Sequence, residues 1–206
     1  NATGVFIHNV DAAVGTAVQS MHQNGEYRCR VDKQIKLDDA FLQWTACSVI
    51  EMVNTTPESY NFGTAQSITP TAYKHNGKYI DIEVNSGAIT TFNNPAPDNN
   101  NINVGNLTVK AGGLNIDYVN TVGKNTGKRT LTVNGNMTVS ATTTFVDSKK
   151  IDITKNLNVS GSTLLYKGDK KNEDGLAVAK NITVSKGTFD ADEVDAIKKI
   201  SNIIIN

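Results

Sequence analysis

The chain has 206 residues, and its 20 Lys and Arg residues balance its 20 Asp and Glu residues, so its formal net charge at pH 7 is zero. This balance, without a basic run interleaved with aromatic residues, argues against a nucleic-acid-binding surface. No stretch approaches the length of about 18 apolar residues that a membrane-spanning helix needs. Abundant Asn, Thr, Ser and Gly favour many short strands and turns over a helical bundle.

Residues 1–76 show strand signals without a recurring unit. The segment from Phe41 to Val53 is rich in aromatic and β-branched residues, which is typical of a strand. Asn76-Gly77 lies between two strand-like segments and predicts a tight hairpin turn. We expect this part to form a β-rich N-terminal cap or small domain. The chain begins with Asn1-Ala2 and not with Met, which indicates an excised fragment.

The only two cysteines, Cys29 and Cys47, lie 18 residues apart in strand-like segments. Paired across a hairpin, they would form a disulfide if the protein is exported. The alternative is two buried free thiols, and the sequence favours neither. No Cys-x-x-Cys motif of a redox or zinc site occurs.

A recurring unit organises the second part of the chain. In each copy an asparagine precedes an apolar, polar, apolar triplet, and the asparagines lie 30, 20 and 25 residues apart. A period of about 20 to 30 residues is typical of stacked repeats. The four copies are Asn106-Leu107-Thr108-Val109, Asn136-Met137-Thr138-Val139, Asn156-Leu157-Asn158-Val159 and Asn181-Ile182-Thr183-Val184.

A second triplet precedes each of these copies, and Ile82-Glu83-Val84 is a candidate for an earlier copy. Because alternate strand residues point to opposite faces, the Leu, Ile, Val and Met positions are expected to share one core. We therefore predict an all-β fold in which residues 77–206 form a single-stranded β-helix, or β-solenoid, of about five coils. The preceding triplets are Ile102-Asn103-Val104, Leu131-Thr132-Val133, Ile151-Asp152-Ile153 and Leu176-Ala177-Val178.

The recurring asparagines have two interpretations. Asparagine tolerates the left-handed backbone region and bonds to nearby main-chain groups, which suits a surface turn. Stacked copies can also bond to one another through their side-chain amides and form a ladder. We expect a structural role in either case for Asn106, Asn136, Asn156 and Asn181.

The hydrophobic period changes near the C-terminus. Asp192 is a candidate helix cap, and Val194, Ile197 and Ile200 form one apolar stripe, which predicts a short helix. A further strand-like triplet, Ile203 to Ile205, follows it. A stack that ends on an open strand exposes its core. We therefore expect the array to be truncated at the C-terminus and to continue in further coils of a longer chain.

Candidate sites for ligands are weak. Trp44, Tyr60 and Tyr118 are aromatic candidates for carbohydrate binding, although core packing is an alternative for Trp44. The segment that contains Asp169, Asn172 and Asp174 offers oxygen donors for calcium, but it lacks the complete pattern of a calcium loop, and a solvated insertion loop is the alternative. We expect no cofactor, no other metal and no catalytic residues.

The coil pattern, Asn-Leu-Thr-Val followed by Ser or Lys, Gly and Thr, resembles the β-solenoid passenger and adhesin repeats of bacterial surface proteins over about residues 80–206. The resemblance implies export, a cell-surface position and a scaffold or adhesion role. It leads us to expect a secreted or cell-surface structural or adhesive module whose partner is a glycan or a host or cell-surface protein. The alternative is a carbohydrate-binding module or a polysaccharide-degrading β-helix enzyme.

Overall fold

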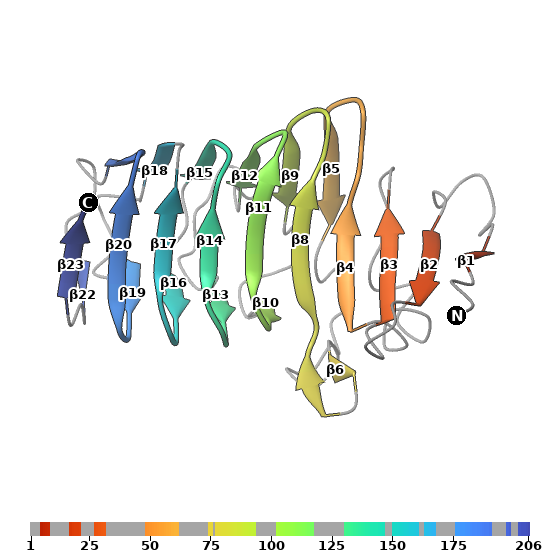
Figure 1. The fold of residues 1–206 in the computed structure, drawn as a ribbon, viewed down its shortest axis with the longest axis horizontal. Coiled ribbons are helices and arrows are strands. Elements are labelled where there is room, and N and C mark those ends of the chain that lie inside the picture. The colour runs from red at the N-terminus through yellow and green to blue at the C-terminus, as the bar shows by residue number, and fades with distance from the viewer. Residues whose placement is uncertain are drawn as a thin grey trace, which may run out of the picture.

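The computed structural model describes the chain as strands joined by turns (Figure 1). The strands lie in three larger sheets, of ten, five and six strands, and in one two-stranded hairpin. The described residues are 5–8, 17–21, 27–31, 48–61, 74–75, 77–93, 102–117, 130–146, 150–160, 163–167, 176–190, 197–198 and 202–206.

The ten-stranded sheet runs the length of the molecule, with its strands side by side (Figure 1). Its first three strands pair antiparallel, and every later pair is parallel. In spatial order the strands are β1 (Val5–His8), β2 (Ala17–Met21), β3 (Tyr27–Val31), β4 (Val49–Met52), β8 (Asp81–Asn85), β11 (Leu107–Ala111), β14 (Met137–Val139), β17 (Leu157–Ser160), β20 (Asn181–Ser185) and β23 (Asn202–Ile205).

The other two large sheets are parallel throughout. The five-stranded sheet contains β10 (Ile102–Val104), β13 (Thr130–Val133), β16 (Lys150–Ile153), β19 (Leu176–Val178) and β22 (Ile197–Lys198). The six-stranded sheet contains β21 (Thr188–Asp190), β18 (Thr163–Lys167), β15 (Thr143–Val146), β12 (Leu114–Asp117), β9 (Thr90–Asn93) and β5 (Glu58–Asn61). From β10 to β21, consecutive strands enter the five-, ten- and six-stranded sheets in turn.

The hairpin predicted at Asn76-Gly77 is confirmed. Strands β6 (Lys74–His75) and β7 (Lys78–Tyr79) pair antiparallel on either side of it. Gly77 has a φ of 76°, a left-handed conformation that glycine adopts without steric cost.

The apolar positions of the repeats align as predicted. Leu107 pairs with Met137, Met137 with Leu157, and Leu157 with Ile182, and all four side chains are fully buried. They belong to one hydrophobic cluster that also contains residues from the five- and six-stranded sheets. Each such side chain contributes about 1.5–3 kcal/mol by leaving water, so the shared core is the main source of stability.

A buried polar network joins the turn after β4 to the turn after β8. Asn54 is fully buried, and its Oδ1 accepts hydrogen bonds from Ser86 Oγ at 2.7 Å and Thr90 Oγ1 at 2.8 Å. Its Nδ2 donates to the Thr56 carbonyl oxygen at 2.8 Å. Because buried polar groups are costly when unsatisfied, this network holds both turns in one conformation.

Two parts of the predicted fold are wrong. Apart from the β6–β7 hairpin, the described strands lie in three separate sheets. None of these closes on itself, so they do not form the single-stranded β-helix that the repeats suggested. Alternation within a strand determines which face is buried, but it does not specify how separate sheets join. The described part of the chain also contains no helix.

The predicted C-terminal helix fails at the residues where the structure tests it. Ile197–Lys198 forms β22 and pairs with β19, while residues 192–196 and 199–200 lie outside the described ranges. β-Branched isoleucine favours strands, and a short helix without a packing surface is marginal in water. The predicted domain boundary at residue 76 stays a prediction, and β4 pairs in parallel with β8 across it.

Candidate functional site

A ladder of asparagines runs along the ten-stranded sheet, at the residue before each apolar triplet. In each step the side-chain Oδ1 of one asparagine accepts a hydrogen bond from the next asparagine along the sheet. The backbone N–H groups of Asn136, Asn156 and Asn181 donate to Asn106, Asn136 and Asn156 at 2.9, 3.2 and 3.3 Å. The side-chain Nδ2 atoms of Asn156 and Asn202 donate to Asn136 and Asn181, each at 3.0 Å. Of the two interpretations of these residues, the hydrogen bonds correspond to the ladder.

Asp81 occupies the first position of this ladder. Its Oδ1 accepts a hydrogen bond from the Asn106 backbone N–H at 2.6 Å, and its Oδ2 accepts one from Asn106 Nδ2 at 2.9 Å. The residue in register before Asp81 is Val49, whose side chain has no acceptor. A carboxylate only accepts hydrogen bonds, so Asp81 ends the ladder without leaving an amide donor unsatisfied.

Sequence reasoning missed Asp81 because it searched for asparagine. The available signal was its position directly before Ile82-Glu83-Val84, which matches the position of the asparagines in later repeats.

Two glycines allow the first steps of the ladder to come close together. A Cβ atom at Gly105 would collide with Asp81 Oδ1 and lie 2.6 Å from the Tyr79 carbonyl oxygen. A Cβ atom at Gly135 would collide with Asn106 Oδ1. Neither glycine has a left-handed backbone, so the close approach of neighbouring chains explains them.

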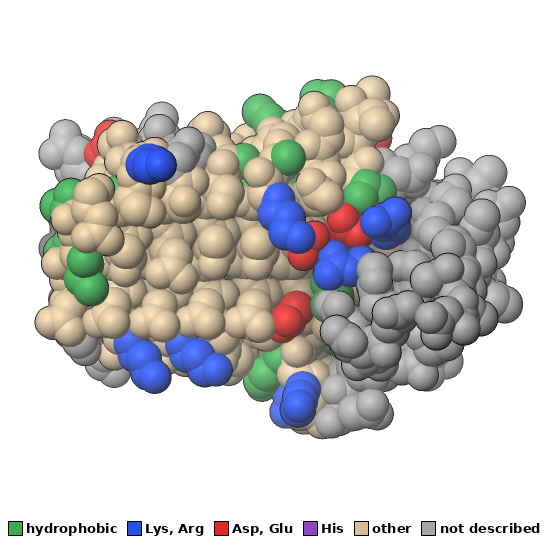
Figure 2. Space-filling model, viewed as in Figure 1, with side chains coloured by type: hydrophobic (Ala, Val, Ile, Leu, Met, Phe, Trp, Pro, Cys, Tyr) green, Lys and Arg blue, Asp and Glu red, His purple; other side chains and the backbone are tan. Residues whose placement is uncertain are grey.

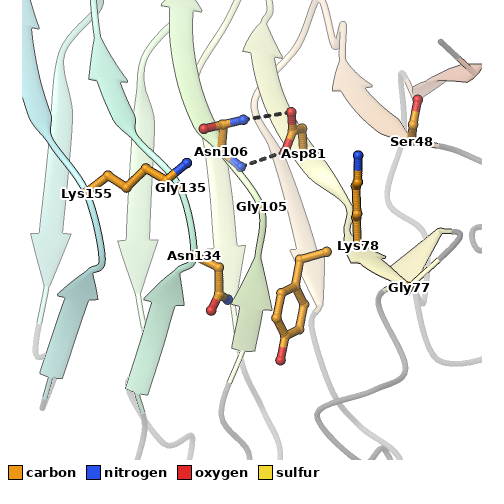
Figure 3. Close-up of a pocket in the computed structure, with 10 residues that line it drawn as sticks. Ser48, Gly77, Lys78, Asp81, Gly105, Asn106, Asn134, Gly135 and Lys155 are labelled. Carbon is orange, nitrogen blue, oxygen red and sulfur yellow. Dashed lines mark hydrogen bonds between the residues drawn. The ribbon is translucent and has the colours of Figure 1, made fainter.

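The same glycines line a hollow beside the ladder, which has a volume of about 600 Å³ (Figure 3). The position of Gly105 and Gly135 is taken by Lys155 in the next repeat, whose side chain extends toward Gly135 in Figure 3. The β6–β7 hairpin contributes Lys78 on the other side. The full lining, which we call the ladder hollow, is Ser48, Gly77, Lys78, Tyr79, Asp81, Gly105, Asn106, Asn134, Gly135 and Lys155.

The ladder hollow is suited to a ligand rich in hydrogen-bond acceptors. Lys78 and Lys155 are exposed and supply ammonium groups, whereas both oxygens of Asp81 are occupied by Asn106. Tyr79 is half-buried, and Lys74 Nζ lies 4.5 Å from the centroid of its ring, a cation–π contact. The hollow therefore offers more positive than negative charge to a bound molecule.

A cluster of charged residues lies on the face of the ten-stranded sheet (Figure 2). Arg28 lies between Glu83 and Glu51, with N–O distances of 3.0 and 3.5 Å. Arg30 Nε bonds to Glu51 at 2.9 Å, and Lys110 Nζ bonds to Glu83 at 2.6 Å. The side chain of Glu51 is 3% exposed and that of Glu83 is 11% exposed, so each ion pair is partly shielded from solvent.

Glu51 ionises more readily than an ordinary glutamate. Burial by itself raises the pKa of its carboxyl group. The hydrogen bonds from Asn85 and Arg30, together with the positive charges of Arg30 and Arg28, outweigh burial and hold the pKa below its usual value. The ion pairs and hydrogen bonds of this cluster connect β3, β4, β8 and β11.

Most residues proposed earlier for ligand binding lie outside the described ranges. They are Trp44, Tyr118, Asp169, Asn172 and Asp174, together with Cys47. The backbone of Tyr60 lies in β5 and that of Cys29 in β3. The carbohydrate, calcium and disulfide hypotheses at these residues stay predictions.

The described part of the chain lacks two features that would indicate a function. No group of three or more His, Cys, Asp or Glu residues there is arranged to hold a metal ion. No described helix has the length and hydropathy to cross a membrane.

The chain matches no protein-family model, no curated protein and no solved structure. Function is therefore inferred from the contacts described above.

Proposed function

We propose that this chain is a structural and adhesive module of a secreted or cell-surface protein, without a catalytic role. The observation that carries the proposal is the unbroken ladder from Asp81 to Asn202, which runs beside one continuous hydrophobic core. Main-chain pairing, side-chain amides and buried apolar residues all connect neighbouring repeats. An array held in these three ways resists bending and shear, which suits a spacer or scaffold.

The ladder hollow supports the adhesive part of the proposal. Ammonium groups bind carboxylate and sulfate, and amide groups bind hydroxyls, so an acidic polysaccharide is the class of ligand that fits Lys78, Lys155 and Asn134. Carbohydrate binding is therefore the second function that the site favours. It uses residues of the hollow and not the aromatic residues proposed from the sequence.

A glycan-array screen with neutral and acidic polysaccharides, combined with an assay for chain cleavage, tests both parts. We expect binding to acidic glycans that weakens with added salt, and no cleavage product. Detection of cleaved polysaccharide would refute the non-catalytic role.

A matched pair of variants tests whether the hollow is the binding site. Lys155 and Lys180 are both exposed and both precede a ladder asparagine, but only Lys155 lines the hollow among the residues described there. Lys155→Ala is expected to weaken glycan binding several-fold, while Lys180→Ala leaves it nearly unchanged. Equal effects of both variants would remove the hollow from the proposal.

Surface localisation needs a separate test. Antibodies against the chain are expected to label intact cells of the source organism as strongly as permeabilised cells. Labelling only after permeabilisation would refute a surface or secreted position.

A further inference from the structure

The outward side of the ten-stranded sheet carries two rows of short, uncharged polar side chains. The first row runs through the middle residue of each apolar, polar, apolar triplet from β11 to β20, and its parallel register is unbroken although the repeats differ in length. The second row lies two residues further along, where Ser160 pairs with Ser185. We call the two rows the hydroxyl face, and its members are Thr108, Thr138, Asn158 and Thr183 in the first row and Ser140, Ser160 and Ser185 in the second.

The backbone fixes the spacing of the hydroxyl face. Neighbouring strands of a sheet lie about 4.7–4.9 Å apart, and residues two apart in a parallel strand lie about 6.6 Å apart along it. The residues that flank the first row are buried in the shared core, as Met137 and Val139 are on either side of Thr138. The asparagine ladder bonds the same strands together two residues before the first row. The two rows therefore form a regular two-dimensional array.

The side chains of the array are held in place and remain accessible to water. First-row residues are half-buried, and threonine is β-branched, which restricts its χ1 angle. In the second row Ser140 and Ser160 are exposed. Every hydroxyl group of the array, like the amide of Asn158, can both donate and accept hydrogen bonds. Figure 2 shows no charged side chain in the middle of this face, between β14 and β20.

Other occupants fit the hydroxyl face less well. An interface with a protein partner or a second copy has an apolar, closely packed centre, whereas all seven residues of this face are polar. Ligand sites for small molecules are concave and lined with apolar and aromatic side chains. None of the seven residues lines the ladder hollow, so this face is distinct from that candidate site.

We propose that the hydroxyl face binds ice. Water molecules held by regularly spaced donors and acceptors take up the spacing of the array, and such ordered waters contribute nearly as much as direct hydrogen bonds. The oxygen atoms of ice repeat at a distance close to the separation of neighbouring strands, so this water layer matches the surface of a growing crystal. A charged side chain within the array would orient water around itself and break the match. This activity is separate from the adhesive role of the ladder hollow.

The test measures the growth of ice crystals in a frozen solution of the full chain, and the incorporation of the chain into slowly grown ice. We expect the chain to slow recrystallisation and to enter the ice. Thr138→Lys, in the middle of the first row, is expected to raise the concentration needed for this effect several-fold. The matched control is Thr132→Lys, because Thr132 is also half-buried between two buried residues but lies in β13 of the five-stranded sheet. The control is expected to behave like the unsubstituted chain.

Circular dichroism checks that both variants fold, and Ser160→Lys at an exposed residue replaces Thr138→Lys if that variant does not. Unchanged ice growth together with exclusion of the chain from ice would overturn the proposal, as would equal effects of Thr138→Lys and Thr132→Lys. Retention on crystalline cellulose or chitin that Thr138→Lys abolishes, without any effect on ice, would also overturn it, because the occupant would then be a neutral polysaccharide.

Discussion

Replacing Asn136 by alanine tests the ladder in its middle. The side-chain Oδ1 of Asn136 accepts two hydrogen bonds from Asn156, from the backbone N–H at 3.2 Å and from Nδ2 at 3.0 Å. Asn136→Ala removes this acceptor. The bond from the residue 136 backbone N–H to Asn106 Oδ1 is retained, because it does not use the substituted side chain.

The magnitude follows from the two lost bonds. A net intramolecular hydrogen bond contributes about 0.5–1.5 kcal/mol, and an unsatisfied donor costs more when it is buried. Asn136 and Asn156 are half-buried, so we expect the free energy of unfolding to fall by about 2 kcal/mol. For a chain of this size, that corresponds to a fall in Tm of about 4–8 °C.

Urea unfolding followed by circular dichroism at pH 7 measures this loss. Asn136→Asp is the matched control, because an aspartate keeps both acceptor bonds, as Asp81 does for Asn106. We expect this variant to lie within about 0.5 kcal/mol of the unsubstituted chain. The reasoning is refuted if the free energy of unfolding of Asn136→Ala also lies within about 0.5 kcal/mol of that of the unsubstituted chain. It is also refuted if the aspartate variant loses as much stability as the alanine variant.

Three further substitutions test the packing, the core and the charged cluster. Gly105→Ala is expected to lower the free energy of unfolding by about 1–3 kcal/mol, because its Cβ would overpack against Asp81. Gly87→Ala is the control, because its Cβ would lie 3.6 Å from Thr55 Cα, and it should change stability by less than about 1 kcal/mol. Similar losses for both variants would contradict the close approach of Gly105 to Asp81. Leu157→Ala is expected to lower the free energy of unfolding by about 2–5 kcal/mol, because the Leu157 side chain is fully buried. The control is Asn158→Ala at the half-buried neighbouring residue. A loss for Leu157→Ala no larger than that for the control would contradict a shared core. Because the folded-state pKa of Glu51 is lowered, its contribution to stability is present above the ordinary value of 4.5 and is lost as the pH falls through the folded value. The stability advantage over Glu51→Gln should therefore shrink in acid, and urea unfolding between pH 3 and 7 that shows a constant difference would exclude this role.

The candidate site was only partly predictable. The asparagines could be found because they recur before similar triplets, and their mutual bonding was one of two stated alternatives. Asp81 was missed because the ladder position requires an acceptor and not a particular residue type. The ladder hollow could not be predicted, because Lys78 of the hairpin and Lys155 line it from opposite sides, and nothing in either local sequence specifies that they share one hollow.

Local alternation in the sequence alone determined the strands and their buried faces, as Leu107, Met137, Leu157 and Ile182 show. The period-2 geometry of a strand acts within a few residues, so it can be read without knowing the fold. Only the tertiary structure decided that the described strands outside the β6–β7 hairpin form three separate sheets, that Ile197–Lys198 is a strand, and that Arg28 lies between Glu51 and Glu83. These features depend on contacts between segments distant in the chain, whose energies outweigh local preference.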